Sequence, residues 1–202
     1  MTRIAGLILA GGQALRMGGG DKAFVTLGGT TLLQRSIATL SAQCDALAIS
    51  ANGDPARYAE HDLPVLPDTL PQRQGPLAGI LAGMEWAAQL GVDQLFTAPV
   101  DTPFLPADVV ARLAAHAGDV GLAIAASPVD DQRRLHPVVG VWPVRLAAAL
   151  RDTLSHGERR VGRFAQANGA VVVPFDGDDA RDPFFNINTP DDLAAAQAVL
   201  DQ

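Results

Sequence analysis

The sequence contains one cysteine, one lysine and no apolar run long enough to cross a membrane, and each shortage excludes a class of protein. Cys44 alone cannot form an internal disulfide or a multi-cysteine zinc site, which fits a reducing cytoplasm. The N-terminal apolar stretch, residues 4–10, ends at a glycine pair and carries no small-residue cleavage site. We therefore expect a cytoplasmic protein that does not contact a membrane.

Positive charge is also scarce. The chain has 15 Lys and Arg residues against 22 Asp and Glu residues, for a net charge of -7. Phosphate backbones attract basic surfaces, so this balance excludes general nucleic-acid binding. An anionic ligand must instead meet a local cluster of cations. Lys22 is the only lysine beside 14 arginines (15 minus 1), which suggests that this position needs a compact ammonium rather than a guanidinium.

What the sequence does contain is typical of one globular α/β domain. Its 202 residues are 48% hydrophobic and 18% charged, enough to bury a core, and neither a linker nor an internal repeat divides residues 1–202. Strand-like apolar runs alternate with segments of helical periodicity. This alternation predicts βαβ units, a mostly parallel sheet and ligand binding at the carboxyl ends of its strands.

The expected elements follow from apolar runs, helical periodicity and glycine or proline breaks. We expect strands over residues 3–10, 46–51, 64–66, 95–100, 120–126, 138–142 and 170–175, and helices over residues 32–40, 77–90, 109–117, 144–154, 161–167 and 191–200. Residues 129–137 depart from the alternation, and we expect them to cap the site as a loop or an excursion of the sheet edge.

A glycine-rich loop follows the first strand. Residues 11–20 include five glycines, which free backbone N–H groups to point at an anion, and Arg16 and Lys22 supply full positive charges. The order of residues matches neither a Walker loop nor a dinucleotide-binding fingerprint. The loop is therefore predicted to hold a triphosphate in another way; the alternative is an ordinary surface turn.

Carboxylates stand where strands end. Asp101 follows a strand between Pro99 and Pro103, and a hard oxygen ligand in that place suits Mg²⁺ on a nucleotide phosphate. The alternative for Asp101 is a helix cap. Asp68 occupies a similar strand end, where the alternative is an ordinary turn residue.

Two further segments join the candidate site. The small residues of the segment 74–79, among them Gly79, would let a nucleobase approach the backbone, although a simple helix start explains them equally well. Asn186 and Asn188 alternate on an extended segment and could help to hold a metal-bound phosphate. Next to them, Thr189 is predicted to cap the last helix, with Asp192 as its structural partner.

Arginines cluster at two more places. Residues 157–160 and Arg163 bring several guanidiniums to a helix start, and Arg133, Arg134 and His136 form a second group. Either cluster could dock a second anionic substrate or simply be a solvated face. Cys44 and the remaining histidines have no partners at ligand spacing and are expected to be structural.

Taken together, these segments resemble the molybdenum cofactor guanylyltransferases. The resemblance rests on the loop 9–19, the pair Asp21 and Lys22, the segment 75–79, the strand end 101–103 and the segment 186–190, in the family's order and over the whole chain. It implies a three-layer Rossmann-like nucleotidyltransferase fold with a mostly parallel central sheet. It also implies an Mg²⁺-dependent transfer of GMP from GTP to the phosphate of molybdopterin, with release of pyrophosphate.

The resemblance, with the patterns above, assigns the site. Asp101, Lys22 and Arg16 are the expected catalytic residues, and Asp101 is the expected metal ligand. The second strand departs from the family pattern at Ser50, so the polar contact there is assigned to Asn52. The residues expected to bind the nucleotide and its metal-bound phosphates are Leu9, Ala10, Gly11, Gly12, Lys22, Asn52, Asp68, Gly79, Asp101, Asn186 and Asn188.

The two halves of the chain are expected to bind different substrates. The N-terminal half is expected to bind GTP and Mg²⁺, and the C-terminal half molybdopterin. Transient contact with molybdenum-insertion proteins or molybdoenzyme chaperones is also expected.

Three alternatives remain open: a molybdopterin cytidylyltransferase, a sugar-phosphate nucleotidyltransferase and a non-catalytic nucleotide-binding regulator. Gly11 after Ala10 and Thr102 after Asp101 favour guanine over cytosine by family pattern.

Overall fold

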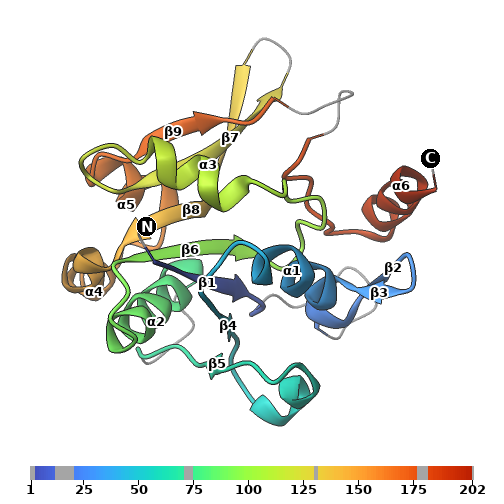
Figure 1. The fold of residues 1–202 in the computed structure, drawn as a ribbon, viewed down its shortest axis with the longest axis horizontal. Helices are drawn as coiled ribbons and strands as arrows, with labels where there is room; N and C mark the ends of the chain where they lie inside the picture. The colour runs from blue at the N-terminus through green and yellow to red at the C-terminus, as the bar shows by residue number, and fades with distance from the viewer. Residues whose placement is uncertain (1–2, 12–20, 71–74, 130–131, 177–181, 202) are drawn as a thin grey trace.

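The computed structural model describes residues 3–11, 21–70, 75–129, 132–176 and 182–201. They build a seven-stranded sheet with helices on both faces, and a small separate hairpin (Figure 1). From edge to edge, the sheet order is β5 (Val65–Leu66), β4 (Ala46–Ser50), β1 (Ile4–Leu9), β6 (Gln94–Pro99), β8 (Gln132–Pro143), β7 (Ala123–Val129) and β9 (Val171–Pro174). All neighbouring pairs are parallel except those of β8, which runs antiparallel to both β6 and β7. The mostly parallel sheet is confirmed.

Two hydrophobic cores make the three layers. One core contains residues of α1 (Leu32–Ser41) and α3 (Val109–His116). The other contains residues of α2 (Pro76–Gln89), α4 (Ala147–Ser155) and α5 (Val161–Ala167). Strand β1 serves both cores, because Ile4 and Ile8 belong to the first and Ala5 and Leu7 to the second. A strand covered on both faces needs apolar residues at every position, which explains its continuous apolar run.

Capping chemistry sets the start of two helices. Thr31 accepts from the amide of Gln34 and begins α1. Thr189 and Asp192 form a capping box at α6 (Pro190–Leu200), with Pro190 in the first turn, as the sequence predicted. None of the helices in the described ranges combines the length and apolar character that a membrane crossing requires.

Several short elements were not predicted. They are the 3-10 helices η2 (Lys22–Phe24), η3 (Pro55–His61) and η4 (Val144–Leu146), and the hairpin strands β2 (Thr26–Leu27) and β3 (Thr30–Thr31). The segment 144–154, expected as one helix, divides into η4 and α4. Two-residue hairpin strands and short 3-10 helices do not show the alternating or 3.6-residue period on which the expected elements rest.

One expectation needs correction. Residues 129–137 are not a capping loop: β7 and β8 form a long hairpin, and β8 continues into the interior of the sheet between β6 and β7. The expected excursion is correct only for the tip, because residues 132–135 pair with β7 alone and extend past the end of β6. Its charged residues, such as Arg133 and Arg134, made the segment read as a loop, but here they occupy an exposed two-stranded arm (Figure 1).

Candidate active site

A cavity of about 890 Å³ opens at the carboxyl ends of β1, β4 and β6, where an α/β sheet usually binds its ligand. Most of the predicted nucleotide-binding residues line it: Leu9, Ala10, Gly11, Lys22, Asn52, Asp68, Gly79, Asp101 and Asn186. Asn188 is joined to the site through Lys22. Gly12 and Arg16 lie outside the described residues.

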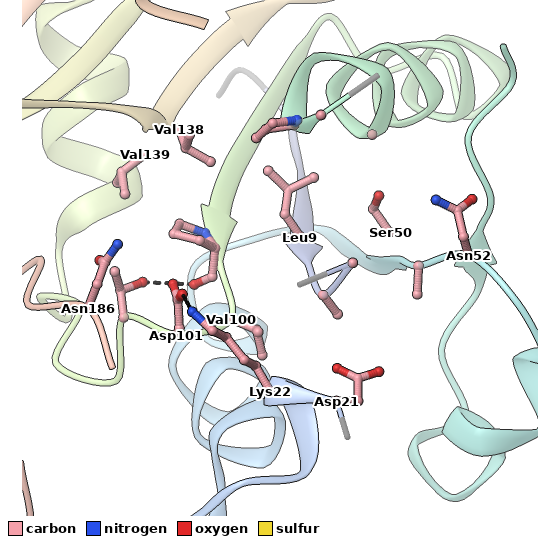
Figure 2. A pocket seen from close by; sticks show the side chains of 18 of the residues that line it. Leu9, Asp21, Lys22, Ser50, Asn52, Val100, Asp101, Val138, Val139 and Asn186 are labelled. Carbon is pink, nitrogen blue, oxygen red and sulfur yellow. Dashed lines mark hydrogen bonds and ion pairs between the residues drawn. The ribbon is translucent and has the colours of Figure 1, made fainter. Parts of the chain in front are cut away.

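Lys22 and Asp101 form an ion pair at one side of the cavity (Figure 2). Lys22 Nζ lies 2.8 Å from Asp101 Oδ2 and also donates to the side-chain oxygen of Asn188. The two charged side chains are only 12% and 13% exposed. Three segments far apart in the sequence therefore meet at one ammonium group.

The backbone holds these segments in place. The amide of Ile187, between the two asparagines, donates to the carbonyl of Asp101 over 2.9 Å. The amide of Asn188 donates to the carboxylate of Asp192, which lowers the pKa of Asp192. The alternative role of Asp101 as a helix cap is wrong, because α3 begins after Asp108.

The second carboxylate oxygen of Asp101 decides whether a metal ion fits. Oδ1 is buried and has no hydrogen-bond partner among the described residues. A buried carboxylate oxygen normally has a partner, so this atom is ready to accept one. The described residues contain no group of three or more His, Cys, Asp or Glu side chains suited to a metal. One carboxylate together with substrate phosphates is a common way to bind Mg²⁺, so the residues present fit that ion.

On the other side of the cavity, Asn52 and Asp68 form a reciprocal pair. The Asn52 amide group donates to Asp68 Oδ2 over 2.9 Å, and its oxygen accepts from the Asp68 backbone N–H over 3.0 Å. This pair joins the end of β4 to the segment after β5. Both side chains keep unused donors or acceptors, which makes them suitable for the hydroxyls or base edge of a nucleoside.

Gly79 packs tightly in the first turns of α2. A Cβ atom added at Gly79 would lie 2.5 Å from Ser50 Oγ and 2.7 Å from Leu9 Cδ2. Both neighbours line the cavity, so the missing side chain sets the shape of the cavity floor. Gly75 is the N-cap residue of α2, and its φ of 73° favours glycine.

Sequence reasoning missed Arg57 and Tyr58, which contact Asp21 beside Lys22. The Asp21 carboxylate accepts from Tyr58 Oη over 2.8 Å and from the Ala23 amide over 3.0 Å, and it pairs with Arg57. Burial, followed by the bond to Asp21, raises the pKa of Tyr58 to about 12. Asp21 thus caps η2, the helix that begins with Lys22. Asp21 stood in the recognised motif, but no sequence signal linked it to η3.

The wall formed by β8 is mostly apolar. Its cavity-lining residues are Leu135, His136, Pro137, Val138 and Val139. Figure 2 shows Val138 and Val139 across the cavity from Ser50 and Asn52. The site therefore has a polar wall near β4 and an apolar wall at β8, with Lys22 and Asp101 at its rim.

The arginine cluster at residues 157–163 lies apart from the cavity lining. The carboxylate of Glu158 accepts from the amides of Arg160 and Arg159, and the Arg163 side chain also binds it, which lowers the pKa of Glu158. The cluster therefore carries its own counter-charge. Its link to the site is indirect: a Cβ added at Gly162 of α5 would lie 3.7 Å from Pro137.

Comparisons with known proteins agree with this geometry. Residues 6–176 match the MobA-like NTP transferase domain family. A molybdenum cofactor guanylyltransferase of Cereibacter sphaeroides is 50% identical over 198 residues, covering 98% of this chain and 97% of the relative. One of Bradyrhizobium sp. is 48% identical over 203 residues, covering 98% and 93%.

Solved structures agree on the fold. Molybdopterin-guanine dinucleotide biosynthesis protein A of Archaeoglobus fulgidus superposes with a TM-score of 0.75 at 23% identity, covering 98% of each chain. The 2-C-methyl-D-erythritol 4-phosphate cytidylyltransferase of Thermus thermophilus superposes with a TM-score of 0.73 at 21% identity, covering 100% of each chain. The three-layer nucleotidyltransferase fold expected from the sequence is confirmed.

Proposed function

The chain belongs to the molybdenum cofactor guanylyltransferase family, and from this premise we propose that it transfers GMP from GTP to the phosphate of the molybdenum-molybdopterin cofactor. A phosphate oxygen of the acceptor attacks the α-phosphorus of GTP. The bond between the α-phosphorus and its bridging oxygen breaks, and pyrophosphate leaves. The observation that carries the proposal is the Lys22–Asp101 pair at the rim of a cavity large enough for a nucleotide and an acceptor.

The protein's own groups support this reaction without a covalent intermediate. Charge gathers on the phosphate oxygens during in-line transfer, and fixed positive groups stabilise it. Lys22 is fixed from two sides by Asp101 and Asn188, so its ammonium is preorganised. Arg16 and the amides of the loop that includes Gly11 and Gly12 complete the proposed phosphate site. Asn186 faces the same cavity and orients the phosphates.

Asp101 is the proposed ligand of an Mg²⁺ ion, because its Oδ1 is buried and free of partners among the described residues. When bound there with the nucleotide, the ion would neutralise charge on the phosphates. Lys22 keeps the other carboxylate oxygen in a fixed place, so Asp101 holds one orientation for the ion. One carboxylate is enough for a Mg²⁺ site whose other ligands include phosphate oxygens of the bound substrate.

The nucleoside is proposed to lie along the polar wall. Leu9, Ala10 and Gly11 line the cavity at the end of β1 and are proposed to contact the nucleotide, and Gly79 lets Leu9 and Ser50 pack closely against α2 at the cavity floor. Asn52 and Asp68 supply the polar contacts. On this arrangement the N-terminal half binds GTP and the C-terminal half receives the pterin within one domain of residues 1–202.

Binding and release measurements separate this function from its alternatives. We expect GTP to bind at least tenfold tighter than CTP or UTP in titration calorimetry, about 1.4 kcal/mol. Pyrophosphate release should require GTP, Mg²⁺ and the acceptor together. Equal or better binding of CTP would favour a cytidylyltransferase. Tight GTP binding without any pyrophosphate release would indicate a regulator.

The cellular setting is part of the proposal. A single cysteine suits a reducing compartment, and we place the reaction in the cytoplasm. Proteins that insert molybdenum, or that chaperone molybdoenzymes, are the proposed transient partners. Co-purification of such a protein with the chain after crosslinking would test this contact.

A further inference from the structure

The apolar wall of the cavity is produced by an irregularity in β8. In the ladder between β7 and β8, Ile124 pairs with Gly140 but the next residue, Ala125, pairs with His136. The three intervening residues, 137–139, lie outside the ladder, and all three line the cavity. Bulges of this kind re-aim side chains and are frequent beside active sites.

Buried hydrogen bonds hold this bulge. The hydroxyl of Thr97 donates to the carbonyl of Val138 over 2.7 Å and accepts from the indole N–H of Trp142 over 2.9 Å. Thr97 and Trp142 are both fully buried. These two bonds tie the irregular segment of β8 to β6.

His136 is the polar side chain on this wall, and one of its two ring nitrogens, Nε2, contacts polar groups of the protein. Nε2 lies 2.7 Å from the hydroxyl of Ser127, which is fully buried, and 3.9 Å from a carboxylate oxygen of Asp182. The ring also packs on Phe184, with 4.8 Å between the centroids. Among the described residues, Nδ1 has no hydrogen-bond partner. Burial lowers the pKa of His136, against the opposing effect of the Asp182 carboxylate, and so favours the neutral ring.

Resting on the proposed function, we propose that His136 binds the acceptor, with Nδ1 at the hydrogen-bonding edge of the acceptor's planar heterocycle and residues 137–139 against its face. The acceptor's phosphate must lie near Lys22 and Asp101 to meet the α-phosphorus. Its ring system then extends toward β8, away from the polar wall that serves the nucleoside. A mostly apolar wall with one imidazole suits an uncharged heterocycle better than a phosphate or sugar acid.

Leu135 extends the apolar wall by one residue beyond His136. It lines the same cavity and is 50% exposed.

Two substitutions of His136 separate contact with the acceptor from a structural role. In His136→Gln the side-chain amide can reach the position of Nε2 and keep the bond to Ser127, but it leaves nothing at Nδ1. In His136→Asn the amide lies near Nδ1 and does not reach Ser127. The matched control is His116→Gln, at the exposed end of α3.

Steady-state transfer is measured with purified molybdopterin varied at saturating GTP, and GTP affinity by calorimetry. We expect His136→Gln to raise the acceptor KM about tenfold and His136→Asn to raise it less, with GTP affinity unchanged in both variants. The control His116→Gln should keep the wild-type acceptor KM and GTP affinity. An acceptor KM within twofold of wild type in a folded His136→Gln protein, or the reverse order of the two variants, would overturn the proposal.

If His136→Gln does not fold, the acceptor KM of Ser127→Ala tests the proposal instead, because this variant keeps the imidazole and removes the hydroxyl that orients it. A several-fold rise of the acceptor KM then supports the proposal, and an unchanged KM overturns it. If wild-type protein transfers no GMP to molybdopterin although GTP binds, the proposed function itself fails, and the role of His136 fails with it.

Discussion

The ammonium of Lys22 lies 2.8 Å from one carboxylate oxygen of Asp101, while the other oxygen of that carboxylate is buried without a partner in the described part of the chain. One oxygen is thus fixed and the other is available. This division lets a single aspartate be held by a cation of the protein and still accept a second cation brought by the nucleotide. The first two predictions test the two members of this pair.

Asp101→Asn keeps the size of the side chain and removes its charge. We predict that turnover in GMP transfer falls by about two orders of magnitude or more, the usual cost of losing a main electrostatic stabiliser. The measurement is kcat over a titration of Mg²⁺. Near wild-type turnover at saturating Mg²⁺ would contradict the role of Asp101.

Lys22→Arg tests why this chain, rich in arginine, has lysine at this place. The Lys22 side chain is only 12% exposed and its ammonium contacts both Asp101 and Asn188, which leaves little room for a planar guanidinium. A charge-assisted contact is worth about 1.5 to 3 kcal/mol. We therefore predict that Lys22→Arg and Lys22→Ala each reduce rate or triphosphate affinity by about 10-fold to 150-fold. Full activity of Lys22→Arg would show that the site accepts either cation.

Gly79→Ala probes the cavity floor, with Gly83→Ala as its matched control on the same helix. A Cβ at Gly79 would press on Ser50 and Leu9, which line the cavity, whereas a Cβ at Gly83 would press on Leu7 and Leu95 in the core. Overpacking costs about 1 to 3 kcal/mol of stability, and we expect a loss in both variants.

GTP affinity should distinguish the two glycine variants. We predict at least a fivefold loss, about 1 kcal/mol, for Gly79→Ala and no change for Gly83→Ala, measured by calorimetry on folded protein. Equal GTP affinity in the two variants would mean that Gly79 serves only the packing of α2.

Tyr58→Phe removes one hydroxyl and keeps the ring that packs on Phe24. It deprives Asp21 of a donor, and Asp21 caps the short helix that begins with Lys22. We predict a loss of about 1 kcal/mol in the free energy of unfolding and a few-fold rise in the KM for GTP, with the acceptor KM unchanged. Unchanged stability together with unchanged KM for GTP would show that this bond positions nothing.

Much of the architecture was predictable because it rests on local patterns. The doubly covered strand β1 reads as a continuous apolar run, and α2 shows helical periodicity that ends at a glycine. The same patterns led to Asp68 and Asp101, since both follow strands whose ends were visible in the sequence. The cap at Thr189 was readable from a single four-residue motif.

The remaining features depend on contacts between distant residues. Lys22 and Asn188 are 166 positions apart, and Tyr58 and Asp21 are 37 apart. Whether β8 would join the sheet interior depends on pairing with β6 and β7, which its charged first half concealed. The three-residue irregularity before Gly140 is a matter of register, which no periodicity reveals.

The product of the reaction tests the central claim most directly. Purified protein is incubated with molybdopterin, Mg²⁺ and each of GTP, CTP, UTP and ATP in turn, and the products are identified by mass spectrometry. We predict a GMP adduct of molybdopterin with one equivalent of pyrophosphate in the GTP reaction, and at least tenfold less product with any other nucleotide. A larger yield from CTP or another nucleotide, or no adduct at all with protein that binds GTP, would contradict the guanylyltransferase assignment.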